Sequence, residues 1–205
     1  MPARAHPDAQ RQAILDAATA VFSEKGFVGA NLDEVVAAAA VSKQTLYKHF
    51  TDKAGLFREI VVQLGSQMEG TFLDVPEPEA IDDVEKWIHA LALRFTRAVM
   101  DPKVQRIRRL VIADAPRFPD VATAYWERGF DRVLGAVGEH FRKLTDAGML
   151  RAPDPLLAAQ HFAGLLLWIP SNRTMFSGRP DVLTDRQLKA YARAGADAFL
   201  RAYGA

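Results

Sequence analysis

The sequence has no cysteine, little net charge and no long hydrophobic run. The absence of cysteine excludes disulfide bonds, thiolate catalysis and cysteine-ligated zinc. With 26 basic and 25 acidic residues the net charge is only +1, so any contact with nucleic acid must come from a local patch. The longest apolar run, residues 165–170, is far too short to cross a bilayer, and the first residues lack the apolar stretch of a signal peptide. We therefore expect no membrane contact and a cytoplasmic location.

Hydrophobic residues nevertheless make up 49% of the chain, which is enough for a sizeable core at this length. They recur at helical spacing, as at Ile14, Ala18 and Phe22, and no alternating strand pattern is present. Beyond the first quarter of the chain, helices are predicted over about 80–100, 103–113, 119–147, 154–172 and 185–202. Pro170 should kink or end its helix, because proline lacks the N–H that the helical ladder needs.

The first quarter predicts a compact module of three short helices, with a fourth helix following at once. Gly26 is expected to stop the first helix, and Asn31, Ser42 and Asp52 are placed to cap the next three. Residues 74–85 hold six acidic side chains and no basic one, which predicts a linker or loop.

The segment 41–50, VSKQTLYKHF, predicts one short helix whose outer face is polar. Residues 42–58 carry four cations against one acid, a local charge of +3 that suits phosphate. Lys43 can pair with guanine or phosphate and Gln44 with adenine, as a helix in the major groove requires. Candidate DNA contacts are therefore Lys43, Gln44, Thr45, Tyr47, Lys48, His49 and Lys53. Ser42 is first a cap, with a phosphate contact as an addition; Tyr47 could instead lean on the core, and the charged residues could simply be solvated.

Several motifs occur together over residues 10–60: ILDAA at 14–18 with Phe22, then Gly26 and Phe27, LDEV at 32–35, and the segment 41–50 followed by Lys53, Leu56 and Phe57. In these motifs the chain resembles the TetR family of bacterial one-component repressors. The resemblance implies a homodimer, an N-terminal helix-turn-helix and a C-terminal helical domain with a small-molecule pocket, and it adds Asn31 to the DNA contacts. Residues 109–119, RLVIADAPRFP, are similar to the AefR-like subgroup of this family.

One position departs from the family pattern. Ala40 stands in the turn where the family often has glycine. A positive φ at this position would cost alanine about 1 kcal/mol relative to glycine, so we expect the turn to be tightened in another way.

The fold predicted from these observations is all-α, with about nine helices. Residues 1–54 would form the helix-turn-helix DNA-binding domain and residues 55–205 a larger helical domain for effector binding and dimerisation. A mostly apolar pocket is expected in the second domain. Its candidate lining residues are Trp87, Phe95, Phe118, Tyr125, Trp126, Phe130, His161, Leu165, Trp168 and Asn172. Aromatic residues at helical spacing can equally be ordinary core, so this pattern indicates only a hydrophobic or aromatic effector.

The last two helices are predicted to form the dimer interface, through a four-helix bundle across a two-fold axis. Small and apolar residues line one side of the last helix, including Leu188, Tyr191, Gly195 and Phe199. The alternative is a helical hairpin that packs inside one chain. The basic cluster between Arg94 and Arg109 could be solvated or ion-paired, could contact the DNA-binding module, or could hold an anionic effector group.

No cofactor, metal site or enzymatic activity is expected. The five histidines show no metal-ligand pairing with a carboxylate motif, and no glycine-rich phosphate loop or nucleophile motif is present. The function predicted from the sequence is a repressor that binds a pseudo-palindromic double-stranded DNA operator and is released by a small, hydrophobic effector.

Overall fold

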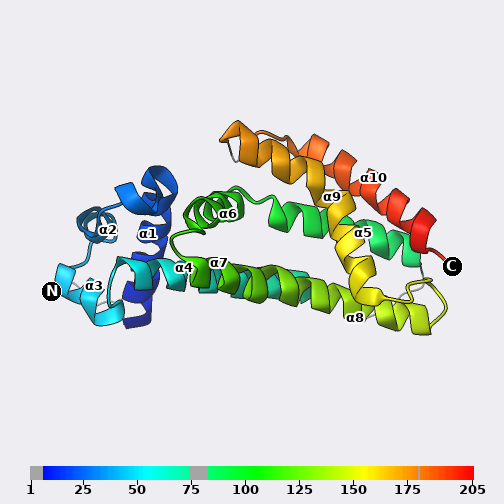
Figure 1. Cartoon of the computed structure of the whole chain (residues 1–205), viewed down its shortest axis with the longest axis horizontal. Helices are drawn as coiled ribbons and strands as arrows, with labels where there is room; N and C mark the ends of the chain where they lie inside the picture. The colour runs from blue at the N-terminus through cyan, green and yellow to red at the C-terminus, as the bar shows by residue number, and fades with distance from the viewer. Residues whose placement is uncertain (1–6, 74–82, 180) are drawn as a thin grey trace. The chain divides into compact units, whose positions relative to one another are not determined.

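The computed structural model describes residues 7–73, 83–179 and 181–205 (Figure 1). In these ranges every regular element is helical, apart from one isolated β-bridge between Leu150 and Gly204. The predicted all-α fold of about nine helices is confirmed, because the segments α7, η2 and α8 follow one another without a break and count as one. Most of the predicted linker, residues 74–82, lies outside the described residues. Within the described ranges, no helix combines the length and apolar content needed to cross a membrane.

The helices fall into two compact units. The first comprises residues up to Leu64 together with Arg106–Tyr125, and the second comprises Gly65–Gln105 together with Trp126–Ala205. Two helices therefore belong partly to each unit. They are α4 (Lys53–Leu73) and α6 (Pro102–Asp114).

The first unit is built on α1 (Pro7–Gly29), α2 (Leu32–Ala38) and α3 (Lys43–His49), with α7 (Pro119–Tyr125). Its core contains Phe22, Leu46 and Phe57, all buried. The predicted stop at Gly26 is confirmed, since Gly26 has φ 70° and interrupts the helical geometry of α1. Glycine tolerates a positive φ best, because it has no Cβ.

The three predicted helix caps are also confirmed. Asn31 Oδ1 accepts the Asp33 N–H at 3.0 Å, and Ser42 Oγ accepts the Thr45 N–H at 3.0 Å. Asp52 Oδ1 accepts the Gly55 N–H at 2.6 Å. Each cap satisfies a backbone donor that has no partner within its helix, and each contributes about 1 kcal/mol.

The turn between α2 and α3 closes through two backbone hydrogen bonds. The Ala40 N–H donates to the Ala37 carbonyl and the Val41 N–H to the Val36 carbonyl, both at 3.2 Å. This is a Schellman motif, and it places Ala40 at the left-handed position with φ 52°. The expectation that the turn would be tightened in another way was therefore wrong. The alanine accepts the conformation that normally selects glycine, because the two bonds satisfy carbonyls at the end of α2.

The second unit consists of α5 (Val84–Val99), the π-helix η2 (Trp126–Asp131), α8 (Arg132–Asp146), α9 (Pro155–Ser177) and α10 (Asp185–Tyr203). Figure 1 shows α9 and α10 side by side, and an aromatic core joins them to α8. The Phe162 ring lies 5.5 Å from that of Phe141 and 5.1 Å from that of Phe199. Phe199 and Gly195, which the sequence predicts at a dimer interface, are thus buried within their own chain.

Pro170 does not end its helix. It lies inside α9, which continues to Ser177 and ends at Gly178 in the left-handed conformation. The helix bends along its length (Figure 1), which is the other effect expected of an internal proline. Continuation is favoured by packing, because Leu166, Pro170 and Thr174 are all buried.

Candidate DNA-binding and effector sites

The outer face of α3 is open to solvent over its polar side chains. Leu46 is fully buried and fixes the opposite face to the core, while Tyr47 keeps 49% of its surface exposed. The other exposed side chains of this face are Ser42, Lys43, Gln44 and Lys48, and Thr45 and His49 are half-buried. The predicted base-reading residues are thus presented together on a short, anchored helix, which is the geometry that a major groove accepts.

Lys43 is paired with an acid of the preceding helix. Its Nζ lies 2.7 Å from Asp33 Oδ1, and this hydrogen bond raises the pKa of Lys43. Asp33 was not among the predicted site residues, because the pair depends on how α2 and α3 cross. A phosphate or a guanine would have to compete with the Asp33 carboxylate for this ammonium group.

Lys53, at the start of α4, points towards the C-terminal end of α1. Its Nζ donates to the Val28 carbonyl at 3.2 Å and lies 4.8 Å from the centre of the Phe27 ring. Burial lowers the pKa of Lys53, and the nearby charge of Arg117 lowers it further. The Lys53 side chain therefore holds the end of α1 against the start of α4. Asn31, which follows the end of α1, is exposed.

Phe118 belongs to the aromatic core of the first unit. Its ring lies 4.4 Å from that of Phe27 and 6.1 Å from that of Phe57. Beside it, Arg58 Nε donates to Asp120 Oδ2 at 2.8 Å. Phe118, before α7, and Asp120, in its first turn, thereby hold the start of α7 against α1 and α4, a role that the sequence did not predict.

The ten candidate effector residues do not form one group. Trp87, Phe95 and Tyr125 are buried, and burial raises the pKa of Tyr125 to about 12. Half-buried or exposed are Phe118, Trp126, Phe130, His161, Leu165, Trp168 and Asn172. Among them, Trp126 stacks on Phe130 within η2, with ring centres 5.6 Å apart.

The two polar candidates on α9 already have partners. His161 Nδ1 lies 2.6 Å from the Tyr203 hydroxyl, and Asn172 Nδ2 donates to the Trp168 carbonyl at 2.7 Å. In the basic cluster, Arg97 forms an ion pair with Asp185 at 2.8 Å. For Arg97 the ion-paired alternative therefore applies.

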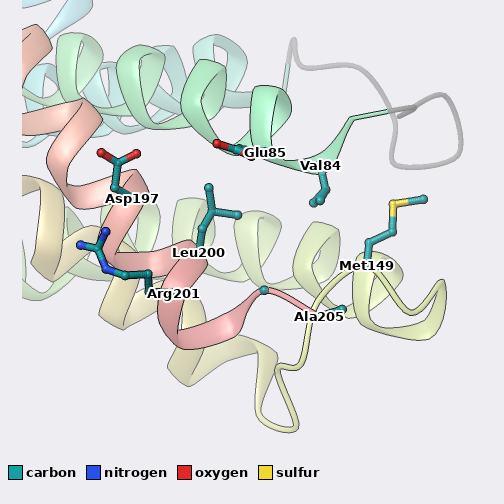
Figure 2. Close-up of a pocket in the computed structure, with 8 residues that line it drawn as sticks. Val84, Glu85, Met149, Asp197, Leu200, Arg201 and Ala205 are labelled. Atoms are coloured by element: carbon teal, nitrogen blue, oxygen red, sulfur yellow. The ribbon is translucent and has the colours of Figure 1, made fainter.

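A pocket of about 620 Å³ opens at one end of the second unit (Figure 2). It lies between the start of α5, the end of α10 and the connection that follows α8. Its lining residues are Val84, Glu85, Met149, Asp197, Leu200, Arg201, Gly204 and Ala205. None of the ten candidates is among them, and three charged side chains make this lining unlike the mostly apolar surface that was predicted. Sequence patterns could not have found it, since its residues come from three distant segments.

A short, exposed polar helix on a capped helix-turn-helix defines a DNA-binding transcriptional regulator. The family model for bacterial regulatory proteins of the tetR family matches residues 14–60, and the model for the AefR-like transcriptional repressor C-terminal domain matches residues 87–205. The chain belongs to the TetR family, with a C-terminal domain of the AefR-like type.

Two of the following relatives are similar over most of the chain, and the third over about a quarter of it. The HTH-type transcriptional repressor SCO4008 of Streptomyces coelicolor is 28% identical over 186 residues, covering 87% of this chain and 89% of that protein. The crystal structure of a TetR-family regulator from Mesorhizobium loti is 38% identical with a TM-score of 0.88, covering 98% of this chain and 100% of the other. The regulator AcrR of Shigella flexneri is 46% identical over 50 residues, covering 24% of this chain and 23% of that protein.

Proposed function

We propose that this regulator is a homodimeric repressor that binds a pseudo-palindromic operator and that a small apolar effector releases it. The single observation that carries the proposal is the exposed polar face of α3, anchored by the fully buried Leu46. A rigid reading helix of this kind has a clear use in a major groove and no comparable use inside the chain.

Within this proposal the candidate DNA-contacting side chains, on α3 and beside it, divide into two groups. Lys43, Gln44 and Thr45 stand in the first turn of α3 and would read base edges. The remaining candidates would grip the sugar-phosphate backbone and set the register. They are Asn31, Ser42, Tyr47, His49, Lys48 and Lys53.

The second copy would bind along α9. Apolar side chains recur on its solvent side, with exposed fractions of 45% for Leu165, 70% for Trp168 and 87% for Phe176. An exposed apolar stripe of this kind is expected to be covered by a partner. A symmetric partner presents the same stripe, so two copies of α9 and α10 would give a four-helix bundle. The dimer would then hold two α3 helices about 34–36 Å apart, one helical turn of DNA.

Release would follow from a difference in effector affinity between two arrangements of the dimer. An effector shifts this equilibrium only as far as it binds the non-binding arrangement more tightly. The helix α4 supports this route, because it begins at Lys53 beside α3 and runs on into the second unit.

Selection of bound duplexes from a random pool tests the proposal, with the full chain as bait. We expect an enriched pseudo-palindrome whose half-sites are separated by about one helical turn, 10–10.5 base pairs. Binding should fall steeply with added salt, because Lys and Arg contacts release counterions from phosphate. Failure to enrich any sequence, or enrichment of one isolated half-site, would contradict a dimeric operator-binding protein.

A further inference from the structure

The second unit buries a group of polar side chains among its apolar ones. Besides His140 on α8, four such residues come from three helices: Thr96 on α5, Gln105 on α6, and Ser171 and Thr174 on α9. Their exposed fractions are 0%, 0%, 5% and 0%, and none of the four is charged. Buried polar groups are normally hydrogen-bonded, so a buried polar atom without a partner calls for an explanation.

In the side-chain amide of Gln105 the nitrogen has a hydrogen-bond partner and the oxygen has none within the described residues. Its Nε2 donates to the Val99 carbonyl at 2.7 Å, which fixes the orientation of the amide. Its Oε1 is buried and accepts no hydrogen bond within the described part of the chain. Asp101, which accepts the Lys103 N–H at 2.8 Å, holds the start of α6 in place. The open oxygen is therefore a preorganised acceptor.

The hydroxyl of Thr96 also lacks a hydrogen-bond partner among the described residues. It is fully buried, and the residues that the structure describes offer it no partner. Thr96 shares a helix face with Met100, one turn later, and Ser171 Oγ lies 3.8 Å from Met100 Sδ. This face of α5 is therefore turned towards α9. Gln105 reaches the same end of α5 through its hydrogen bond to the Val99 carbonyl, so Thr96, Gln105 and Ser171 belong to one region of the second unit.

We propose that Thr96 and Gln105 form the hydrogen-bonding end of the effector site, and that the effector is a neutral, apolar or aromatic molecule carrying a hydroxyl or N–H donor. The inference rests on the proposed effector-released repressor and names the chemistry of its ligand. Because Gln105 Nε2 is occupied and Oε1 is open, the ligand must donate a hydrogen bond to this side chain. The Thr96 hydroxyl can then accept or donate a second one.

The residues around Thr96 indicate the chemistry of the rest of the ligand. The residues on the same helix face as Thr96 are Ala92, Val99 and Met100, and all three are buried and apolar. Apolar contact would bind the body of the ligand, while a small number of placed polar groups would orient it. A charged ligand is disfavoured, because a buried ion without a countercharge has a high desolvation cost.

A matched pair of probes tests the inference on the full chain: 4-butylphenol, which carries the donor, and butylbenzene, which lacks it. Binding of each is measured by quenching of tryptophan fluorescence and by titration calorimetry. We expect the phenol to bind the wild type about tenfold or more tightly than the hydrocarbon, because a buried acceptor without a partner disfavours the analogue. In Thr96→Val and in Gln105→Leu that ratio should fall to about one to threefold.

Thr145→Val is the matched control. Thr145 is a half-buried threonine of the same unit whose hydroxyl already donates to the Phe141 carbonyl at 2.8 Å. It should leave the probe ratio unchanged. Thermal unfolding separates binding from folding: Thr96→Val should unfold at the wild-type temperature or above, since it removes an unpartnered hydroxyl. If Gln105→Leu fails to fold, the affinity ratio is measured in Thr96→Val and in Gln105→Met instead.

The inference is overturned if the wild type binds neither probe, or if the ratio survives in both variants. The proposed function is measured separately, by fluorescence anisotropy of the selected duplex. Phenol that binds and loses affinity in the variants, yet leaves the duplex bound, would support the polar site and contradict effector-driven release.

Discussion

At the scale of single residues, the proposed DNA contacts divide into side chains that would read bases and side chains that would bind phosphate. Gln44→Ala removes a side chain suited to adenine, so we expect weaker discrimination against a changed base pair in the selected operator, by about 1–3 kcal/mol. Lys48→Ala should weaken binding to all duplexes alike and flatten the slope of log affinity against log salt by about one unit. Anisotropy titrations over a salt series on matched and altered duplexes measure both effects. Unchanged base preference in Gln44→Ala would remove Gln44 from the reading set.

The ion pair between Lys43 and Asp33 makes a second residue-scale prediction. Asp33→Asn removes the carboxylate that occupies the Lys43 ammonium at 2.7 Å and that would repel a nearby phosphate. We expect operator affinity to rise about threefold, a modest gain because exposed ion pairs are weak. The Lys43→Ala variant should abolish that gain. If Asp33→Asn still tightened binding in the Lys43→Ala background, the effect would come from overall charge.

A third prediction at the residue scale concerns Ala40. Ala40→Gly relieves a left-handed alanine at φ 52° and should raise the free energy of unfolding by about 0.5–1 kcal/mol, after allowance for the freer unfolded chain. Ala37→Gly, at an exposed helical position of α2, is the control and should lower it by about 0.5–1 kcal/mol. Urea denaturation measures both. A destabilising Ala40→Gly would mean that the turn carries little strain.

Local chemistry decided which of these residues the sequence could predict. The caps at Asn31 and Ser42 were readable because a cap bonds to a backbone group only two or three residues away. The strain at Ala40 was misjudged, since the two bonds that close the turn depend on the end of α2. Asp33 and Gln105 were missed because their partners are set by how helices meet.

At the scale of elements, the helices of the second unit were predicted well, because a strong 3.6-residue period is a local signal. The predicted helix over 119–147 is interrupted in geometry by the π-helix Trp126–Asp131. An inserted residue of this kind leaves the hydrophobic pattern almost intact, so periodicity alone does not reveal it. The sequence places Gly195 on a face of the last helix that packs against another helix, but it could not tell that this neighbour belongs to the same chain.

Gly195 gives the prediction at this scale. A Cβ added there would lie 2.6 Å from Leu166 Cδ2 and 3.2 Å from the Leu165 carbonyl oxygen, and the backbone atom cannot move aside cheaply. Gly195→Ala should therefore lower the free energy of unfolding by about 1–3 kcal/mol by forcing α9 and α10 apart. Gly135→Ala in α8, where a Cβ meets nothing within 4 Å, should raise it by about 0.5–1 kcal/mol. Equal effects in denaturation would show that the helix pair has room to adjust.

At the scale of the whole molecule, the proposed function requires two copies to associate through α9 before they bind a pseudo-palindromic operator. Trp168 is 70% exposed and stands at the centre of the apolar stripe, where a charge could not be buried without a partner. Trp168→Glu should therefore give a monomer by analytical ultracentrifugation at concentrations where the wild type is a dimer, while helix content and the melting of each single chain are retained. Affinity for the full pseudo-palindrome should fall by at least about a hundredfold, because the second half-site no longer adds an intramolecular contact.

The control for this change is Trp126→Glu. It places the same charge on an aromatic of comparable exposure, 53%, in η2 instead of α9. It should leave the dimer and the operator affinity intact. A variant Trp168→Glu that remains dimeric would move the interface away from α9, and a monomer with undiminished operator affinity would show that one reading head suffices. Either result would break the link between the stripe on α9 and the symmetry expected of the operator, while the chemistry of α3 would stand.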